Sequence, residues 1–189
     1  MTSVEPLSPA TVFREWIRRE TDKSETPDRD PTGWDRDRAI RVLAETFDEP
    51  ARPAATGEPV WHAVTLSGAE LGALGTFPEP AWDRLSDDGT VAGAVDRFAA
   101  ADGVESSFPG ATETVRAMRP AATTELGAAV ARAVDGDGEP TGSWPPRLLD
   151  GNHRACAVHW AARQGASTSL TVHLAHDRPL SALPLESDP

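Results

Sequence analysis

The sequence has almost no lysine and no tyrosine. Its 18 basic residues are Lys23 and 17 arginines, and tyrosine is absent. No GxxxxGKS or GxxxxGKT phosphate loop is present, and a Schiff-base or lysine-nucleophile mechanism would depend on one residue in a polar segment. Lysine chemistry is therefore nearly excluded, and a phenolic acid or base is excluded altogether.

Cysteine and long apolar stretches are also scarce. Cys156 is the single cysteine among 189 residues, so no internal disulfide can form, and one thiol among five scattered histidines makes no structural zinc site. No run approaches the roughly 20 apolar residues of a membrane-spanning helix, and the first ten residues lack a basic region followed by an apolar run. We therefore expect a cytoplasmic protein that is stabilised by packing.

The chain is strongly acidic. It carries 30 Asp and Glu residues against 18 Lys and Arg residues, which gives a formal net charge of −12. Such a field repels the phosphates of nucleic acids and anionic lipid head groups. The arginines form no basic stretch that would offset it. We expect neither nucleic acid nor a membrane surface as a partner.

Hydrophobic periodicity divides the chain into a helical start and a mixed remainder. Helices are expected over 11–20 and 35–47, and the composition of 51–59 is that of a linker. We therefore divide the chain into an N-terminal helical extension, residues 1–52, and a domain over residues 53–189. The two N-terminal helices offer a docking surface for a protein partner or for a homodimer.

The second part begins with a strand pattern and continues with helix patterns. Apolar and polar side chains alternate over 60–66, which predicts a strand. Helices are expected over 68–75, 90–101 and 123–134. The middle of this part, about 67–143, is interpreted as a helical insertion into a small α/β domain.

The segment RLLDGNHRACAVHWAARQG predicts a strand, a tight turn and a helix. A short apolar strand over 147–149 leads into Asp-Gly-Asn at 150–152, which favours a positive backbone φ. A helix follows over about 153–164, Gly165 ends it, and another strand is expected over 170–174. The fold class is therefore mixed α/β.

The start of this helix is an expected anion site. Its unsatisfied N–H groups and dipole favour a negative charge, yet His153 and Arg154 lie in the first turn. A cation there costs about 0.3–1 kcal/mol unless a carboxylate or a bound anion compensates it. A phosphate held by Arg154, His153 and backbone amides fits best. The alternative is that Arg154 pairs with Asp150 at the surface.

The same residues resemble a known family. LLDGNHRACAVHWAARQG is similar to the phosphate-contacting strand, turn and helix of the ParB and sulfiredoxin superfamily, whose members carry variants of a DGxHRxxA or GCHR motif at this junction. The resemblance covers about residues 144–174. It implies a small sheet with flanking helices that binds a nucleoside triphosphate through Gly151, Asn152, His153 and Arg154. Asn152 stands where sulfiredoxins carry the catalytic cysteine, so sulfinic-acid reduction is not expected.

The motif and the resemblance together predict an activity. We expect a nucleotide-dependent phosphotransferase or nucleotide hydrolase that uses ATP or CTP with Mg²⁺ and acts on a small metabolite. Asp150 would hold the metal or accept a proton, while His153 and Arg154 would neutralise the transferred phosphate. Asp150 is equally suited to begin an Asx turn. The alternative function is a non-catalytic nucleotide- or metabolite-binding module that regulates a partner protein.

Other chemistry-bearing residues have structural interpretations too. Glu70, after the first predicted strand, is the nearest carboxylate for kinase chemistry. His62 lies on an apolar strand face, where a hydrogen-bonded core histidine is commoner than a base. Cys156 is three residues after His153, which would suit a nucleophilic pair, but packing is the commoner role. Packing, lid or loop roles without a metal are expected for the remainder, namely His159, Trp160, Trp144, His173, His176, Asp87–Asp88 and Asp135–Asp137.

Overall fold

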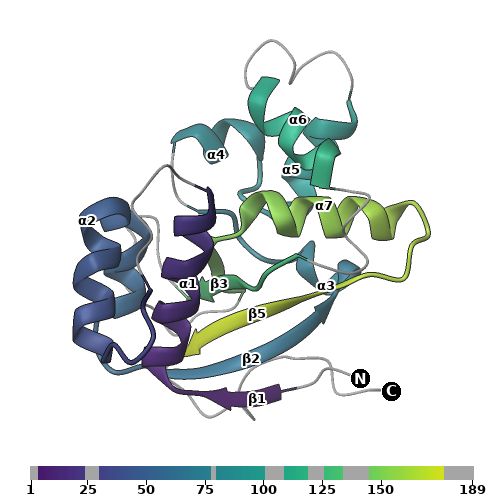
Figure 1. Ribbon diagram of the computed structural model, residues 1–189. Helices are drawn as coiled ribbons and strands as arrows, with labels where there is room; N and C mark the ends of the chain where they lie inside the picture. The colour runs from purple at the N-terminus through teal and green to yellow at the C-terminus, as the bar shows by residue number, and fades with distance from the viewer. Residues whose placement is uncertain are drawn as a thin grey trace.

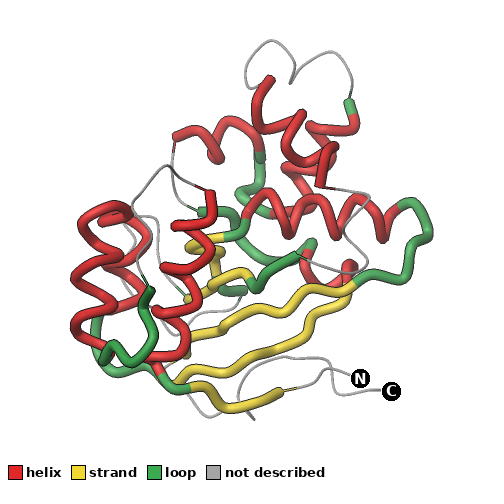
Figure 2. Tube along the Cα trace, in the orientation of Figure 1, coloured by secondary structure: helices red, strands yellow, loops and turns green. Residues whose placement is uncertain are grey.

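The computed structural model has an α/β fold and describes residues 4–23, 30–77, 80–100, 109–118, 126–133 and 145–176 (Figures 1 and 2). Along the described residues the elements follow in the order β1 (Val4–Leu7), α1 (Pro9–Lys23), α2 (Arg36–Ala55), β2 (Val60–Ser67), α3 (Gly68–Leu71), α4 (Pro80–Leu85), α5 (Val91–Ala99), α6 (Pro109–Met118), β3 (Ala129–Arg132), β4 (Arg147–Asp150), α7 (Asn152–Arg163) and β5 (Ser169–His176).

The strands form one five-stranded sheet in the order β1-β2-β5-β3-β4. The longest pair is β2 with β5, which are antiparallel from Val60 opposite His176 to Ser67 opposite Ser169. β3 runs parallel to β5 and antiparallel to β4, while β1 adds an antiparallel edge strand beside β2. The expected α/β class is thus confirmed.

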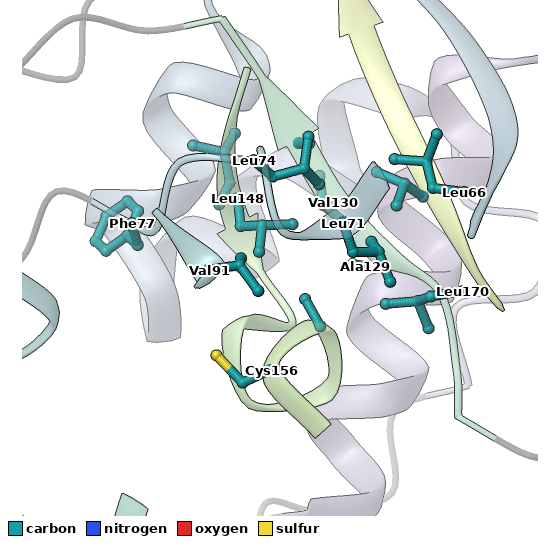
Figure 3. Packing of buried hydrophobic residues seen from close by; sticks show 14 of the residues in the cluster. Leu66, Leu71, Leu74, Phe77, Val91, Ala129, Val130, Leu148, Cys156 and Leu170 are labelled. Carbon is teal, nitrogen blue, oxygen red and sulfur yellow. The ribbon is translucent and has the colours of Figure 1, made fainter. Parts of the chain in front are cut away.

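Different helices cover the two faces of the sheet. On one face, Phe13 of α1 lies edge-on to Trp61 of β2, with ring centroids 5.8 Å apart. Leu66 points to the opposite face, because it lies five positions after Trp61 and side chains alternate along a strand. There Leu66 lies opposite Leu170, and both belong to the same apolar cluster as Cys156 of α7 (Figure 3). Helix α7 packs against α3, α5 and α6. Figure 1 shows α1 beside α2 and, apart from them, α7 among the remaining helices.

Helix α1 follows directly from the apolar spacing of its sequence. Val12, Phe13, Trp16 and Ile17 recur at the helical period, and all four are buried. Ser8 precedes the helix, and its hydroxyl accepts a hydrogen bond from the backbone N–H of Thr11. The polar remainder of the helix includes side chains that belong to the site described below.

Several sequence predictions of local structure are confirmed. The strand expected over 60–66 is β2, and the helix expected over 90–101 is α5, whose first turn is capped by the side chain of Thr90. The expected strand-turn-helix-strand unit near the C-terminus is β4, α7 and β5. The helices expected over 11–20 and 35–47 are present and longer, as α1 and α2, whereas only Gly68–Leu71 is helical within 68–75.

The helix expected over 123–134 is wrong. Residues 123–125 and 134 lie outside the described residues, and Ala129–Arg132 forms the strand β3 between β5 and β4. All four β3 residues are buried, so pairing on both sides outweighs the helix propensity of alanine. The middle of the chain, about 67–143, therefore contributes a central strand as well as helices.

The linker expected over 51–59 is also wrong in its first half. Helix α2 continues to Ala55 although Pro50 and Pro53 lie inside it. The expected domain boundary between residues 52 and 53 thus falls within a helix, and β1 from the N-terminal part pairs with β2. Within the described ranges, no helix combines the length and apolarity needed to cross a membrane.

Candidate functional site

The DGNHR motif lies where β4 passes into α7. Asp150 ends the strand, and Gly151 has φ +90°, which is the left-handed conformation expected from the sequence. A Cβ atom on Gly151 would lie 2.7 Å from Cβ of Ala129, so β3 also requires a glycine here. Among the described residues, no side chain caps the start of α7. The helix therefore presents its first N–H groups without a side-chain acceptor.

We predict that Gly151→Ala lowers the free energy of unfolding by about 2 kcal/mol, because the left-handed conformation and the contact with Ala129 both penalise a methyl group. Gly165→Ala is the matched control, since Gly165 also has φ +90° but a Cβ there would meet nothing within 4 Å. It should cost about 1 kcal/mol. Urea unfolding measures both values, and equal losses would contradict the steric part of this explanation.

Two arginines meet the carboxylate of Asp150. Nη2 of Arg154, one turn into α7, donates to Oδ2 of Asp150 at 2.7 Å, and Nη2 of Arg19 in α1 lies 3.8 Å from the same oxygen. The side chains of Arg154, Asp150 and Arg19 are only 8%, 14% and 15% exposed. The alternative pairing of Arg154 with Asp150 is therefore present, but it is largely buried and it includes a second cation.

These two guanidinium groups carry more positive charge than Asp150 neutralises. Nε and Nη2 of Arg19 and Nε of Arg154 are buried and have no hydrogen-bond partner among the described residues. Burial lowers the pKa of Arg19 and the positive charge of Arg154 lowers it further, while Asp150 and, more weakly, Glu15 and Glu20 raise it. Buried donors of this kind are costly unless an acceptor satisfies them. The arrangement is suited to an anionic acceptor.

His173 of β5 faces the same charges from the sheet. Its side chain is buried, with Nε2 3.4 Å from Oε2 of Glu15 in α1. Burial lowers the pKa of His173 to about 4, and the positive charges of Arg19 and Arg154 contribute to this shift. The imidazole is therefore neutral at pH 7. Its Nδ1 is buried without a hydrogen-bond partner in the part of the chain that the structure describes.

We call Arg19, Asp150, Arg154 and His173 the arginine cluster. The sheet register brings its members together, because β3 lies between β4 and β5 and Val130 is opposite both Asp150 and His173. Helix α1 supplies Arg19 from one layer and α7 supplies Arg154 from the other. The cluster can hold a negatively charged group between the two layers.

The other two residues of the motif have different surroundings. Oδ1 of Asn152 accepts a hydrogen bond of 3.1 Å from the backbone N–H of Phe77, and the Asn152 side chain is buried. The ring of His153 lies edge-on to Trp82 of α4, with centroids 5.0 Å apart. Of the four residues expected at a phosphate, the structure brings Gly151 and Arg154 to the arginine cluster.

The alternative catalytic residues are engaged in structural contacts. Cys156 lies on the buried face of α7, and this burial raises the pKa of its thiol. It is therefore a packing residue rather than a nucleophile. Nδ1 of His159 and the carbonyl of Gly68 form a 2.7 Å hydrogen bond. Glu70 and Ser67 make a capping box at the start of α3.

The remaining candidates are distributed over the fold. Nε2 of His176 and Nδ1 of His62 lie 2.9 Å apart between neighbouring strands, and Trp160 is buried. Asp88 accepts hydrogen bonds from Ser86 and Thr90 in the turn before α5, and Asp87 pairs with Arg97. Trp144 and Asp135–Asp137 lie outside the described residues.

Sequence reasoning missed Arg19 and Glu15, and for His173 it considered only a role as a metal ligand, which it rejected. Glu15 and Arg19 come from α1, far along the chain from the motif, and His173 comes from β5, the strand that follows α7. The available signal was the four-residue spacing of Glu15 and Arg19 on one helix face. That spacing is common on exposed helices, so it did not identify a site.

The arginine cluster does not fit a magnesium ion. The Asp150 carboxylate already lies against two guanidinium groups, which oppose the approach of a second kind of cation. Within the described ranges, no three His, Cys, Asp or Glu side chains are grouped so that they could hold a metal. We therefore derive no chemical step from a metal on Asp150.

Comparison with known proteins finds no match to a protein-family model, to a curated protein or to a solved structure. The resemblance to the ParB and sulfiredoxin superfamily therefore stays a prediction based on the DGNHR segment. The fold class is established by the structure, and the site must be interpreted from its own chemistry.

Proposed function

We propose that the protein binds the phosphate group of a nucleotide or phosphorylated metabolite at the arginine cluster. The observation that carries this proposal is that the largely buried guanidinium groups of Arg19 and Arg154 share the carboxylate of Asp150. The uncapped start of α7 adds a partial positive charge at the same place. ATP and CTP are the ligands that the sequence resemblance implies.

Each member of the arginine cluster has a role in this binding. Arg154 and Arg19 would donate forked, charge-assisted hydrogen bonds to phosphate oxygens. His173 is neutral and can add one further donor without adding charge. Gly151 allows the backbone to turn closely beside the ligand. Together these groups position and neutralise an anion.

Binding without catalysis is the function that the geometry supports best. Asp150, the expected base or metal ligand, has Oδ2 occupied by Arg154. The lowered pKa of His173 makes its imidazole a weak base. The phosphotransferase or hydrolase expected from the resemblance would use the same cluster to hold the transferred phosphate, and it would need an acid or base from elsewhere.

Ligand titration tests the binding proposal. We expect ATP, CTP, GTP or their diphosphates, with or without Mg²⁺, to raise the melting temperature of the wild-type protein. Arg154→Gln should weaken the affinity at least tenfold, because a charge-assisted hydrogen bond contributes about 1.5–3 kcal/mol. This variant leaves Asp150 beside Arg19, so the remaining carboxylate still has a cation nearby.

Arg163→Gln is the matched control. Arg163 lies in the same helix and pairs with Asp96, but both side chains are exposed and distant from the motif turn. Its replacement should leave the affinity unchanged. The proposal is wrong if none of these ligands shifts the wild-type melting temperature, or if Arg154→Gln and Arg163→Gln bind them equally well.

A turnover assay separates the two functions. The ligand that binds is incubated with the protein, and the release of phosphate or diphosphate is followed over time. Release above background that Arg154→Gln abolishes would favour a hydrolase or phosphotransferase. Binding without release would favour a nucleotide- or metabolite-binding module that acts through a partner.

A further inference from the structure

The arginine cluster already contains an anion of its own. The Asp150 carboxylate accepts a hydrogen bond from Arg154 and lies within 4 Å of Arg19. An external anion that binds these guanidinium groups must therefore compete with a carboxylate of the same chain. Because that carboxylate is held only one helical turn from Arg154, its effective concentration is high.

From this competition we infer that the ligand carries a terminal phosphate monoester, and that this dianion displaces the carboxylate of Asp150 from Arg154. The inference rests on the proposed function and specifies the class of ligand. It concerns the chemistry of the group that is bound, which is shared by a phosphorylated metabolite, a nucleoside monophosphate and the end of a nucleotide chain.

Charge is the first reason for this choice. Arg19 and Arg154 together carry two positive charges, and Asp150 supplies one negative charge. A phosphate monoester carries close to two negative charges above its second pKa of about 6. It can therefore neutralise both guanidinium groups, whereas a carboxylate or a phosphodiester carries one charge and gains nothing over Asp150.

The number of acceptor atoms is the second reason. Nε and Nη2 of Arg19, Nε of Arg154 and Nδ1 of His173 are buried and have no hydrogen-bond partner within the described residues. A terminal phosphate offers three free oxygens around one centre, and a carboxylate offers two. The phosphate thus satisfies more of these donors than Asp150 does.

The cluster also allows such an exchange. Asp150, Arg154 and Arg19 each retain a small exposed area, so the cluster reaches the surface of the protein. Asp150 ends β4 directly before Gly151 and lies outside α7, so a change of its side-chain rotamer does not require the helix to change. Two further carboxylates, Glu15 and Glu20, act on Arg19 from α1. Glu15 lies against His173 and is more exposed than Asp150.

Calorimetric titration of the full chain with four small anions tests the inference. At pH 7.5 and constant ionic strength, the probes are inorganic phosphate, glycerol phosphate, dimethyl phosphate and acetate. We expect phosphate and glycerol phosphate to bind at least tenfold more tightly than dimethyl phosphate or acetate. Equal affinity for acetate and glycerol phosphate would overturn the inference.

Removal of the internal competitor is the second arm of the test. Asp150→Asn should bind phosphate at least tenfold more tightly than the wild type and should begin to bind acetate. Asp96→Asn, which removes the exposed partner of Arg163, should change neither affinity. If Asp150→Asn does not fold, the ranking of the four anions on the wild-type protein still decides the question.

The outcomes distinguish this inference from the proposed function. If phosphate and its monoesters bind neither the wild type nor Asp150→Asn, both are wrong. If they bind the wild type through Arg154 but Asp150→Asn binds no more tightly, the displacement is wrong and the proposed function remains. Phosphate binding by Asp150→Asn alone would overturn the displacement, because the carboxylate of Asp150 would then outcompete the dianion in the wild type.

Discussion

Asp150→Asn is expected to lower the free energy of unfolding by about 3 kcal/mol, as is typical when one partner of a buried ion pair is removed. The variant retains the size of the side chain but leaves the guanidinium groups of Arg154 and Arg19 without the carboxylate. Two like charges then face each other in a largely buried place. Urea unfolding at low ionic strength measures the loss.

Phosphate should restore part of this stability. An anion that binds the folded protein and not the unfolded chain stabilises it by mass action. The stabilisation should be larger in Asp150→Asn than in the wild type, because the variant lacks the carboxylate that competes for the guanidinium groups. Asp96→Asn is the control, because its exposed pair with Arg163 should contribute less than about 1 kcal/mol. Equal losses in the two variants would show that Asp150 does not compensate the buried arginines.

The sequence predicts best those elements that carry their own boundary signals. The unit β4-α7-β5 was predicted to within a few residues because an apolar run, a positive-φ glycine at Gly151 and a helix end at Gly165 follow one another locally. Strand β3 carries no such signal. Its short alanine-rich run is compatible with a buried helix or a buried strand, and only its neighbours β4 and β5 decide between them.

Edge strand β1 was not predicted, because it too lacks a local sequence signal. It has four residues, contains Pro6 and is largely exposed, so neither length nor apolar alternation marks it. Proline is tolerated there because an edge strand leaves one row of N–H groups unpaired. Its pairing with β2 depends on the tertiary structure.

The candidate site likewise contains residues that a local motif predicts and residues that only the tertiary structure brings to it. Asp150, Gly151 and Arg154 could be predicted because a turn and the helix that follows it form one local motif. Asn152 and His153 were assigned to the same ligand, but consecutive helix residues point about 100° apart, since a turn contains 3.6 residues. The motif could therefore not place all of its side chains on one group.

The partners from other elements could not be predicted. Arg19 and His173 join the motif because α1 lies against the sheet and β5 is the second strand from β4. Burial of a cation gives no local sequence signal. The sharing of one carboxylate by two largely buried guanidinium groups, on which the proposed function rests, is thus a property of the tertiary structure.

His173 should make the protein sensitive to acid well above the range in which ordinary carboxylates titrate. Burial, Arg19 and Arg154 lower its pKa from 6.5 to about 4 in the folded protein. Between these two values the unfolded chain binds more protons than the folded protein, so stability rises with pH across this window. Acidification from pH 7 to pH 4 should therefore remove roughly 3 kcal/mol, at about 1.4 kcal/mol per unit of pKa shift.

Urea unfolding at intervals from pH 4 to pH 7 measures this dependence, and His173→Gln should flatten the curve because glutamine does not titrate. His62→Gln is the control. Burial and His176 also lower the pKa of His62, but that ring is far more exposed and should contribute little. The pKa values of Asp30 and Asp88 are lowered below 3.8, so protonation of these carboxylates affects stability only at still lower pH. An unchanged slope in His173→Gln would mean that the arginine cluster does not lower the pKa of His173. An imidazole with the same pKa in the folded and unfolded states adds nothing to the pH dependence of stability.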